Sequence, residues 1–449
     1  MKMSSASSKS SKKFLGRWDS VAIVIAITVG NGIFRVPALV AQYLPSAPFV
    51  MLAWLAGGVV SLLGAACYAE LSSSWPQTGG NYIYLKKAYG RWLAFLYGWS
   101  ELLVVRTGSI AAVSFICAEY ICSFFSLSPY LVKPLAIILV FSSSCANIFG
   151  LHYGTKLQNM LTIPKLAALA GIIIFGFSSG KGDVSNFYIT PMPQTGEGML
   201  GLFFLALIPI LWTYGGWHEN TFVAGETKDA SKTIPLALIW GVVSVTALYL
   251  VMNALYIYLI PVEKLKDAPL IASDALFILS GASGKKILEV IVIISSLAGI
   301  NATILTGGRV TYALGQDNEV FKYIGKTHPV FGTPVRALGL NAAWSAVLIL
   351  AGTFDKLLFF TGVLVWFFFA LAAASIYILR FKFPEFKRRG YRVWGYPLTP
   401  ALFMGVCLLL FYYTFSAYTF ESLVGSGLML SGIPVYLISR RLKRTEKPA

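Results

Sequence analysis

Two short glycine-rich stretches stand in segments that are otherwise apolar enough to cross a bilayer. The first is TVGNGIF, residues 28–34, within the apolar run 19–43. Glycine weakens a helix by roughly 1 kcal/mol per residue relative to alanine, and an asparagine at bilayer depth needs polar partners. An interrupted helix exposes carbonyl groups where its first half ends and amide N–H groups where its second half begins. Free groups of both kinds at one point can bind a small zwitterion.

The second stretch is LIPILWTYGGWHENTFVAGE, residues 207–226, in which Pro209 precedes Gly215 and Gly216. Non-helical backbone is tolerated at membrane depth only where it is buried in protein or lines a wet cavity. The two stretches together therefore predict one binding site formed by two interrupted helices. The alternative interpretation is that the paired glycines only let helices pack closely.

The composition is that of an integral membrane protein with little chain outside the bilayer. Of 449 residues, 57% are hydrophobic and 12% are charged, and the mean hydropathy is +0.70. Because about 20 apolar residues span the hydrocarbon core, the sequence predicts an all-α fold with about twelve transmembrane helices. The expected spans are residues 19–43, 48–74, 92–125, 130–150, 157–177, 199–226, 235–260, 286–315, 336–351, 356–380, 397–418 and 423–438.

The two glycine-interrupted spans are the first and the sixth, with four ordinary spans between them. They hold corresponding positions in two blocks of five helices, and an odd number of spans per block inverts the second block relative to the first. This is the inverted-repeat plan of many secondary transporters. The expected divisions are a disordered cytoplasmic tail 1–16, one transmembrane domain 17–441 with repeats at about 17–178 and 199–380 and extra helices at about 397–438, and a cytoplasmic tail 442–449.

The net charge of +17 comes from cations at the ends of the spans rather than from a basic stripe. Lys86, Lys87 and Arg91 follow the second span, and Arg440 and Arg441 follow the last one. This positive-inside pattern predicts that both termini are cytoplasmic, and it gives no support to nucleic-acid binding. The basic start lacks the apolar core of a signal peptide, so we expect none to be removed.

The candidate residues for chemistry other than binding are few. Five cysteines are scattered mostly within apolar segments, so we expect neither a disulfide framework nor a metal site. The three histidines, His152, His218 and His328, are too far apart in the sequence to suggest a metal triad or a catalytic dyad. We therefore expect no cofactor and no enzyme activity. A channel is disfavoured because two broken helices are typical of alternating access.

The residues of both stretches resemble those of a known family. GNGIF and WTYGGW are similar to the signatures of L-type amino acid transporters in the amino acid, polyamine and organocation superfamily. The segments ELSSSWPQTGG, VAGETKDASKTIPLAL and SSLAGINATILTGGRVTYAL extend the likeness, which covers about residues 15–441. The resemblance implies a LeuT-type 5+5 inverted repeat with helices 1 and 6 unwound. It also implies sodium-independent exchange or uptake of amino acids at the plasma membrane.

The same resemblance implies roles for individual residues. Gly30, Asn31 and Gly32 would bind the substrate carboxylate, while Thr28 and Val29 would flank the amino group. Trp212 would cover the substrate from outside, and Gly215 and Gly216 would form the sixth-span half of the site. The remaining members of the expected substrate site are Ile33, Thr213, Tyr214 and Trp217. The aromatic residues Trp212, Tyr214 and Trp217 favour an apolar side chain on the substrate, and the alternative is a basic side chain held by cation–π contact.

Lys165 is the ionisable residue that we weigh most among those inside the spans. The resemblance places it where sodium-coupled relatives hold a sodium ion, so its ammonium would bond carbonyls of span one and the hydroxyl of Ser295 or Ser296. The alternative is a lysine that reaches the cytoplasmic interface. His218 and Glu219 could carry a proton, because histidine titrates near neutrality, or could merely start a helix.

The third span carries Glu101, Arg106 and Glu119, which we expect to be structural. Five residues separate Glu101 from Arg106, a spacing that disfavours a direct pair on an α-helix.

From the two interrupted spans and the resemblance, we expect an amino acid exchanger. The alternative is a proton-coupled amino acid or amine symporter or uniporter of the same fold. Cys122 lies near the outer end of the third span, and we expect no heavy-chain subunit attached to it.

Overall fold

The computed structural model of this chain is built from helices, and no β-strand is present among the residues that it describes. Those residues are 16–77, 79–148, 151–188, 198–318, 321–329, 332–388 and 390–445. Apart from Gly16, the predicted N-terminal tail lies outside them. The last helix extends into the predicted C-terminal tail as far as Thr445, and residues 446–449 lie outside the described residues.

The first predicted span consists of two helices rather than one. Helix α1 (Arg17–Thr28) and helix α2 (Val36–Tyr43) flank a short 3₁₀ turn, η1 (Gly32–Phe34). The remaining elements up to residue 188 are α3 (Ala47–Ser74), α4 (Asn81–Tyr89), α5 (Arg91–Ser100), the π-helical turn η2 (Glu101–Val105), α6 (Arg106–Phe124), η3 (Pro129–Leu131), α7 (Val132–Ile148), α8 (Leu151–Ser178) and η4 (Val184–Phe187).

The second half of the chain also begins with an interrupted span. Helix α9 (Gly198–Thr213) ends before the 3₁₀ segment η5 (Trp217–Glu226) begins. The later elements are α10 (Ala230–Leu259), α11 (Val262–Leu265), α12 (Ile271–Asp317), α13 (Val335–Ala351), α14 (Phe354–Lys382), η7 (Pro384–Arg388), α15 (Leu398–Ala417), α16 (Thr419–Leu430) and α17 (Gly432–Thr445). Ser280 and Gly281 have non-helical backbone angles, so α12 is kinked before the eighth predicted span.

Eight of the described helical segments are long and apolar enough to cross a membrane, and three shorter apolar helices accompany them. Some predicted boundaries agree with the helices, whereas the eighth span lies within the longer α12 and the twelfth is divided between α16 and α17. Helix α3, for example, begins one residue before the expected residue 48 and ends at the expected residue 74. The total of about twelve transmembrane helices stays a prediction.

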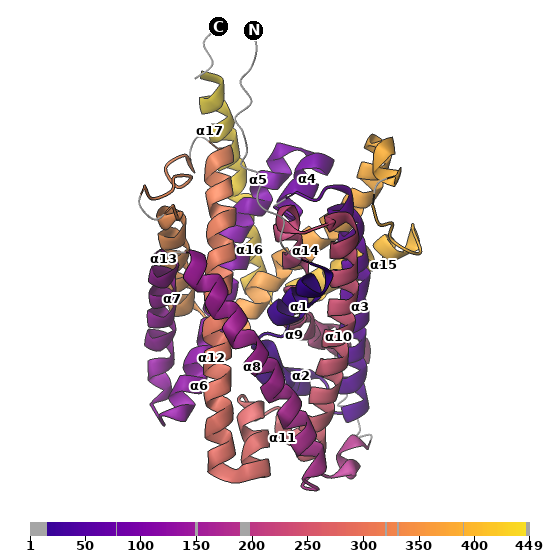
Figure 1. Ribbon diagram of the computed structural model, residues 1–449, viewed down its shortest axis with the longest axis vertical. Helices are drawn as coiled ribbons and strands as arrows, with labels where there is room; N and C mark the ends of the chain where they lie inside the picture. The colour runs from indigo at the N-terminus through magenta and orange to yellow at the C-terminus, as the bar shows by residue number, and fades with distance from the viewer. Residues whose placement is uncertain are drawn as a thin grey trace.

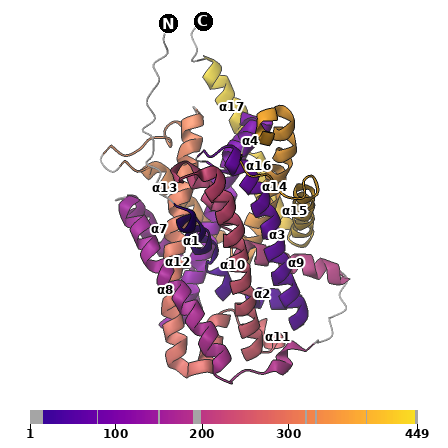
Figure 2. The same cartoon turned by 45° about the vertical axis from the view of Figure 1, so that its right-hand side comes forward.

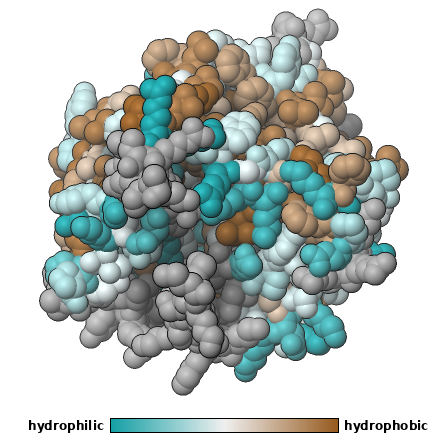
Figure 3. Space-filling view, turned by 90° about the horizontal axis from the view of Figure 1, so that it is seen from above, coloured by the Kyte–Doolittle hydropathy of each residue, from teal (hydrophilic) through white to brown (hydrophobic). Residues whose placement is uncertain are grey.

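The interrupted helices lie inside the bundle. Figures 1 and 2 show α1 in its interior beside α10, with α8 and the long α12 crossing one side. Helices α4 and α17, which carry the predicted basic ends, lie at one end of the molecule, and α11 lies at the other. Figure 3 looks onto the α17 end, where hydrophilic residues are spread over the face and hydrophobic ones gather along part of its rim.

One expectation about the third span was wrong. Arg106 Nε lies 3.2 Å from Glu101 Oε2, and both side chains are buried. The spacing argument assumed an α-helix, in which residues five apart do not share a face. The backbone from Glu101 to Val105 is instead a π-helical turn, whose i to i+5 repeat stacks these two side chains.

Candidate functional site

The first interruption leaves backbone amides without partners. Beyond Thr28 the chain stays non-helical until Gly32, and the amides of Asn31, Gly32 and Ile33 donate to no backbone carbonyl of another described residue. Such amides carry partial positive charge, and all three follow one another along the chain. They can therefore receive an anionic group of a ligand.

The carbonyls that end α1 are mostly occupied. The Lys165 ammonium donates to the carbonyl of Ala26 at 3.2 Å and also to that of Val29. The Tyr249 hydroxyl lies 2.8 Å from the carbonyl of Thr28. The carbonyl of Ile27 accepts no hydrogen bond from any described residue. Among the last carbonyls of α1, that of Ile27 is thus the one that accepts no hydrogen bond from the described part of the chain.

Tyr249 connects the two interruptions and was missed by the sequence analysis. Its hydroxyl also lies 3.1 Å from the carbonyl of Thr213, the last residue of α9. A tyrosine in an apolar helix such as α10 is compositionally ordinary, so only its buried hydroxyl hints at a polar partner. The contact holds the ends of α1 and α9 at a common point.

Glycine is required where the interruptions touch. A β-carbon on Gly32 would lie 2.5 Å from Thr213 Oγ1, and one on Gly216 would lie 2.9 Å from Ile27 Cγ2. Gly216 also has a φ of +106°, which L-residues rarely adopt. The predicted glycines therefore permit a close crossing of the two broken helices.

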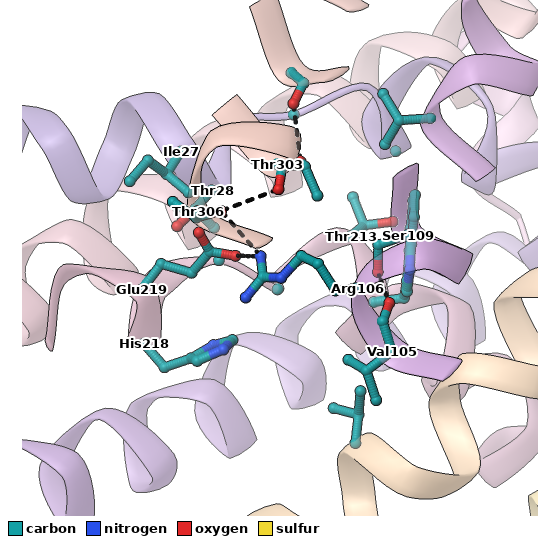
Figure 4. A pocket seen from close by; sticks show the side chains of 18 of the residues that line it. Ile27, Thr28, Val105, Arg106, Ser109, Thr213, His218, Glu219, Thr303 and Thr306 are labelled. Atoms are coloured by element: carbon teal, nitrogen blue, oxygen red, sulfur yellow. Dashed lines mark hydrogen bonds and ion pairs between the residues drawn. The ribbon is translucent and has the colours of Figure 1, made fainter. Parts of the chain in front are cut away.

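A cavity of about 230 Å³ lies at this crossing (Figure 4). Twelve of the predicted site residues line it: Thr28, Gly30, Asn31, Gly32, Lys165, Trp212, Thr213, Gly215, Gly216, His218, Glu219 and Ser295. Five do not: Val29, Ile33, Tyr214, Trp217 and Ser296. The structure thus brings both interruptions and the charged residues after the second one to one space.

Two of the aromatic residues expected at the site are packed away from it. The Tyr214 hydroxyl donates to the carbonyl of Trp54 at 3.1 Å. Trp217 packs edge-on against Tyr68. Of the three expected aromatic residues, Trp212, Tyr214 and Trp217, only Trp212 lines the cavity. The ring of Trp212 meets that of Phe354 edge-on.

The predicted contact of Lys165 with span eight is not formed in this structure. Lys165 bonds carbonyls of α1, whereas the hydroxyls of Ser295 and Ser296 are buried and have no hydrogen-bond partner among the described residues. Lys165 is 7% exposed and lines the cavity, so it does not reach the interface as the alternative interpretation supposed.

Arg106 organises the charged part of the cavity. Besides the contact with Glu101, its Nη1 lies 2.8 Å from Glu219 Oε1 and 3.3 Å from Thr306 Oγ1. Figure 4 shows Arg106 and Glu219 pointing toward one another across the cavity. Arg106 and Glu101 line the cavity but were expected to be structural. A π-helical turn has no sequence signal that would have paired them.

An ion pair lies toward the α11 end of the cavity. Arg35, at the start of α2, donates from Nε to Glu119 Oε2 of α6 at 3.3 Å. Its Nη2 lies 3.8 Å from Asp355, and its guanidinium lies over the ring of Phe354. These contacts join the second half of the first span to α6 and α14.

Among the described residues, no group of three or more His, Cys, Asp or Glu side chains could hold a metal ion.

Residues 15–438 match the amino acid permease family. The chain belongs to this family. The permease family is part of the amino acid, polyamine and organocation superfamily that the two glycine motifs resemble. The resemblance is therefore confirmed, and the fold is of the LeuT type.

Individual relatives cover most of this permease. The serine/threonine exchanger SteT of Bacillus subtilis is 29% identical over 438 residues, which are 96% of this chain and 98% of SteT. The human b(0,+)-type amino acid transporter 1 is 29% identical over 388 residues, covering 84% of this chain and 78% of the relative. The mouse large neutral amino acids transporter small subunit 2 is 27% identical over 449 residues, covering 95% and 81%. This permease is a multi-pass membrane transporter and not an enzyme.

Proposed function

We propose that this permease is a sodium-independent exchanger that carries amino acids across the plasma membrane by alternating access. Three named relatives support amino acids as the substrate, and SteT is named as an exchanger. The observation that carries the proposal is the crossing of two interrupted helices over one cavity, with unpaired amides on one side and a free carbonyl on the other.

The free backbone groups suggest how an amino acid would lie. The carboxylate would accept from the amides of Asn31 and Gly32, which line the cavity, and the ammonium would donate to the carbonyl of Ile27. The carbonyls of Thr28 and Val29 already accept from Tyr249 and Lys165, so they would support the interruption rather than bind the ammonium. Trp212 would cover the substrate, since this residue lines the cavity.

Lys165 accounts for independence from sodium. Its ammonium satisfies two carbonyls of α1, which are the kind of ligand that a sodium ion would bind at an interrupted helix. A fixed positive charge on a side chain does not leave with the substrate. The transport cycle would then draw on no sodium gradient, and exchange of one amino acid for another would be sufficient to drive it.

We propose further that both termini face the cytoplasm and that the repeats comprise about residues 17–178 and 199–380, with residues 397–438 outside them. One relative is named a small subunit. We propose that this permease works without a heavy-chain partner, because Cys122 is buried on α6 rather than displayed on a loop.

The experiment is radiolabelled amino acid uptake into liposomes that contain the purified permease. We expect uptake to need an unlabelled amino acid inside the liposomes and to be equal in sodium and choline buffers. Uptake into empty liposomes that grows with an imposed proton gradient would instead favour the proton-coupled alternative, in which His218 and Glu219 carry the proton. Uptake of no amino acid under either condition would contradict the proposal.

A further inference from the structure

Arg106 is held on three sides by side chains from three different elements. Glu101 comes from η2, Glu219 from η5 and Thr306 from α12, at 3.2, 2.8 and 3.3 Å. Arg106 is 6% exposed, and a guanidinium bound by two carboxylates in a buried place has little freedom to turn. The guanidinium is therefore fixed in the cavity wall before any substrate binds (Figure 4).

One nitrogen of this guanidinium remains available. Arg106 donates from Nε and Nη1, while Nη2 has no hydrogen-bond partner among the described residues. The described residues do not enclose Nη2 completely, so this nitrogen faces open space. Because Arg106 lines the cavity, this open space is where a substrate would lie.

Two hydroxyl groups that also line the cavity can accept hydrogen bonds. Thr303 lies one turn from Thr306, and its hydroxyl donates to the carbonyl of Gly299 at 2.8 Å. Ser109 lies one turn beyond Arg106, and its hydroxyl donates to the carbonyl of Val105 at 2.7 Å. With their protons committed, both oxygens keep lone pairs that can accept. The wall thus presents one fixed donor together with acceptors.

This pairing distinguishes between classes of side chain. A hydroxyl or an amide both donates and accepts, whereas a carboxylate only accepts and an ammonium only donates. The carboxyl groups of Glu101 and Glu219 beside Arg106 disfavour an anionic side chain, and the exposed Nη2 disfavours a cationic one. An apolar side chain would cover Nη2 and leave it without a partner in a buried place.

We propose that Arg106, Thr303 and Ser109 form a subsite for the substrate's side chain that selects uncharged hydroxyl and amide groups. The inference rests on the proposed function, because the α-amino and α-carboxylate groups must be bound at the two interruptions for the side chain to reach this wall. It differs from the sequence-based expectation of an apolar side chain, which drew on Trp212, Tyr214 and Trp217, of which only Trp212 lines the cavity.

The first experiment is competition against radiolabelled L-alanine exchange in proteoliposomes. L-threonine and L-valine have nearly the same shape, so their inhibition constants isolate the effect of the hydroxyl. We expect threonine to bind about tenfold more tightly than valine, as a hydrogen bond to a charged donor provides. L-asparagine should likewise bind more tightly than L-leucine and L-aspartate. Equal or tighter binding of valine and leucine, or preference for aspartate or lysine, would overturn the inference.

The second experiment assigns the preference to these residues. Arg106→Lys keeps the charge but loses the planar fork, and we expect the threonine-to-valine ratio to fall toward one. Arg336→Lys makes the same change on α13, away from the cavity, and should keep the wild-type ratio. If Arg106→Lys does not fold, Thr303→Val, which preserves shape and charge, should still lower the ratio. An unchanged ratio in the folded variants would contradict the assignment.

These outcomes separate the inference from the proposed function. Exchange of amino acids without preference for hydroxyl or amide side chains would remove the subsite and leave the exchanger intact. Failure to exchange any α-amino acid would overturn both.

Discussion

Gly32 of the first interruption packs directly against Thr213 of the second, leaving no room for a β-carbon between them. The contact matters because it sets the distance between the free amides that follow α1 and the end of α9. Any side chain at this position must push the two broken helices apart. The geometry of the cavity therefore depends on the absence of a single methyl group.

The first prediction concerns this contact. Gly32→Ala places a β-carbon 2.5 Å from Thr213 Oγ1, so we expect exchange to fall at least about tenfold while the permease still assembles, because overpacking forces backbone shifts. The matched control is Gly171→Ala on α8, where a β-carbon meets nothing within 4 Å. The measurement is the rate of amino acid exchange in proteoliposomes for both variants. Wild-type exchange by Gly32→Ala would show that the crossing is not tight.

A second prediction concerns the hydroxyl that connects the interruptions. Tyr249→Phe removes the contacts with the carbonyls of Thr28 and Thr213, so we expect a loss of thermal stability of about 1–2 kcal/mol and weaker substrate binding. Tyr256→Phe is the control on the same helix, because the Tyr256 hydroxyl is buried without a partner among the described residues. A thermal-shift assay with and without substrate compares them. Equal behaviour of the two variants would contradict the role of Tyr249.

The third prediction tests the fixed cation. Lys165→Ala leaves the carbonyls of Ala26 and Val29 without their partner, so we expect exchange in sodium-free buffer to be lost almost completely. Lys133→Ala removes a lysine that bonds the carbonyl of Leu350 at the exposed end of α7 and should exchange normally. Intact exchange by Lys165→Ala would refute the assignment of this lysine.

Trp212 provides the fourth prediction. This residue lines the cavity and its ring packs against Phe354, so Trp212→Ala should weaken substrate affinity about tenfold, and Trp212→Phe should restore part of the loss. Trp240→Ala removes an indole that is 56% exposed and serves as the control. Competition by unlabelled substrate gives the affinities. An unchanged affinity for Trp212→Ala would mean that another group covers the substrate.

The fifth prediction concerns the ion pair between α2 and α6. Arg35→Gln and Glu119→Gln should each lower the apparent unfolding temperature, since each leaves a partly buried charge without its partner. The double variant should lose less than the sum of the two, with a coupling of roughly 0.5–3 kcal/mol. Additive losses would show that the 3.3 Å contact contributes nothing.

The interruptions were predictable from the sequence because their cause is local. Glycines with a buried asparagine at Gly30 to Gly32, and the pair Gly215 and Gly216, weaken a helix wherever they occur. Lys165 was predictable for a similar reason, since a charge within an apolar segment must find partners. These residues carry their own signal.

The residues that were missed depend on distant partners or on an unusual backbone. Tyr249 acts on Thr28, which is 221 residues away in the sequence, and nothing near Tyr249 marks that contact. Glu101 and Arg106 pair only because the chain makes a π-helical turn, which no local residue type announces. The side-chain half of the site therefore needed the structure, whereas the backbone half did not.

The most direct measurement of the central claim is a high-resolution structure of the permease with an exchanged amino acid bound. The account predicts the carboxylate on the amides of Asn31 and Gly32 and the ammonium on the carbonyl of Ile27. An amino acid bound elsewhere, or continuous helices through Gly32 and Gly216, would contradict it.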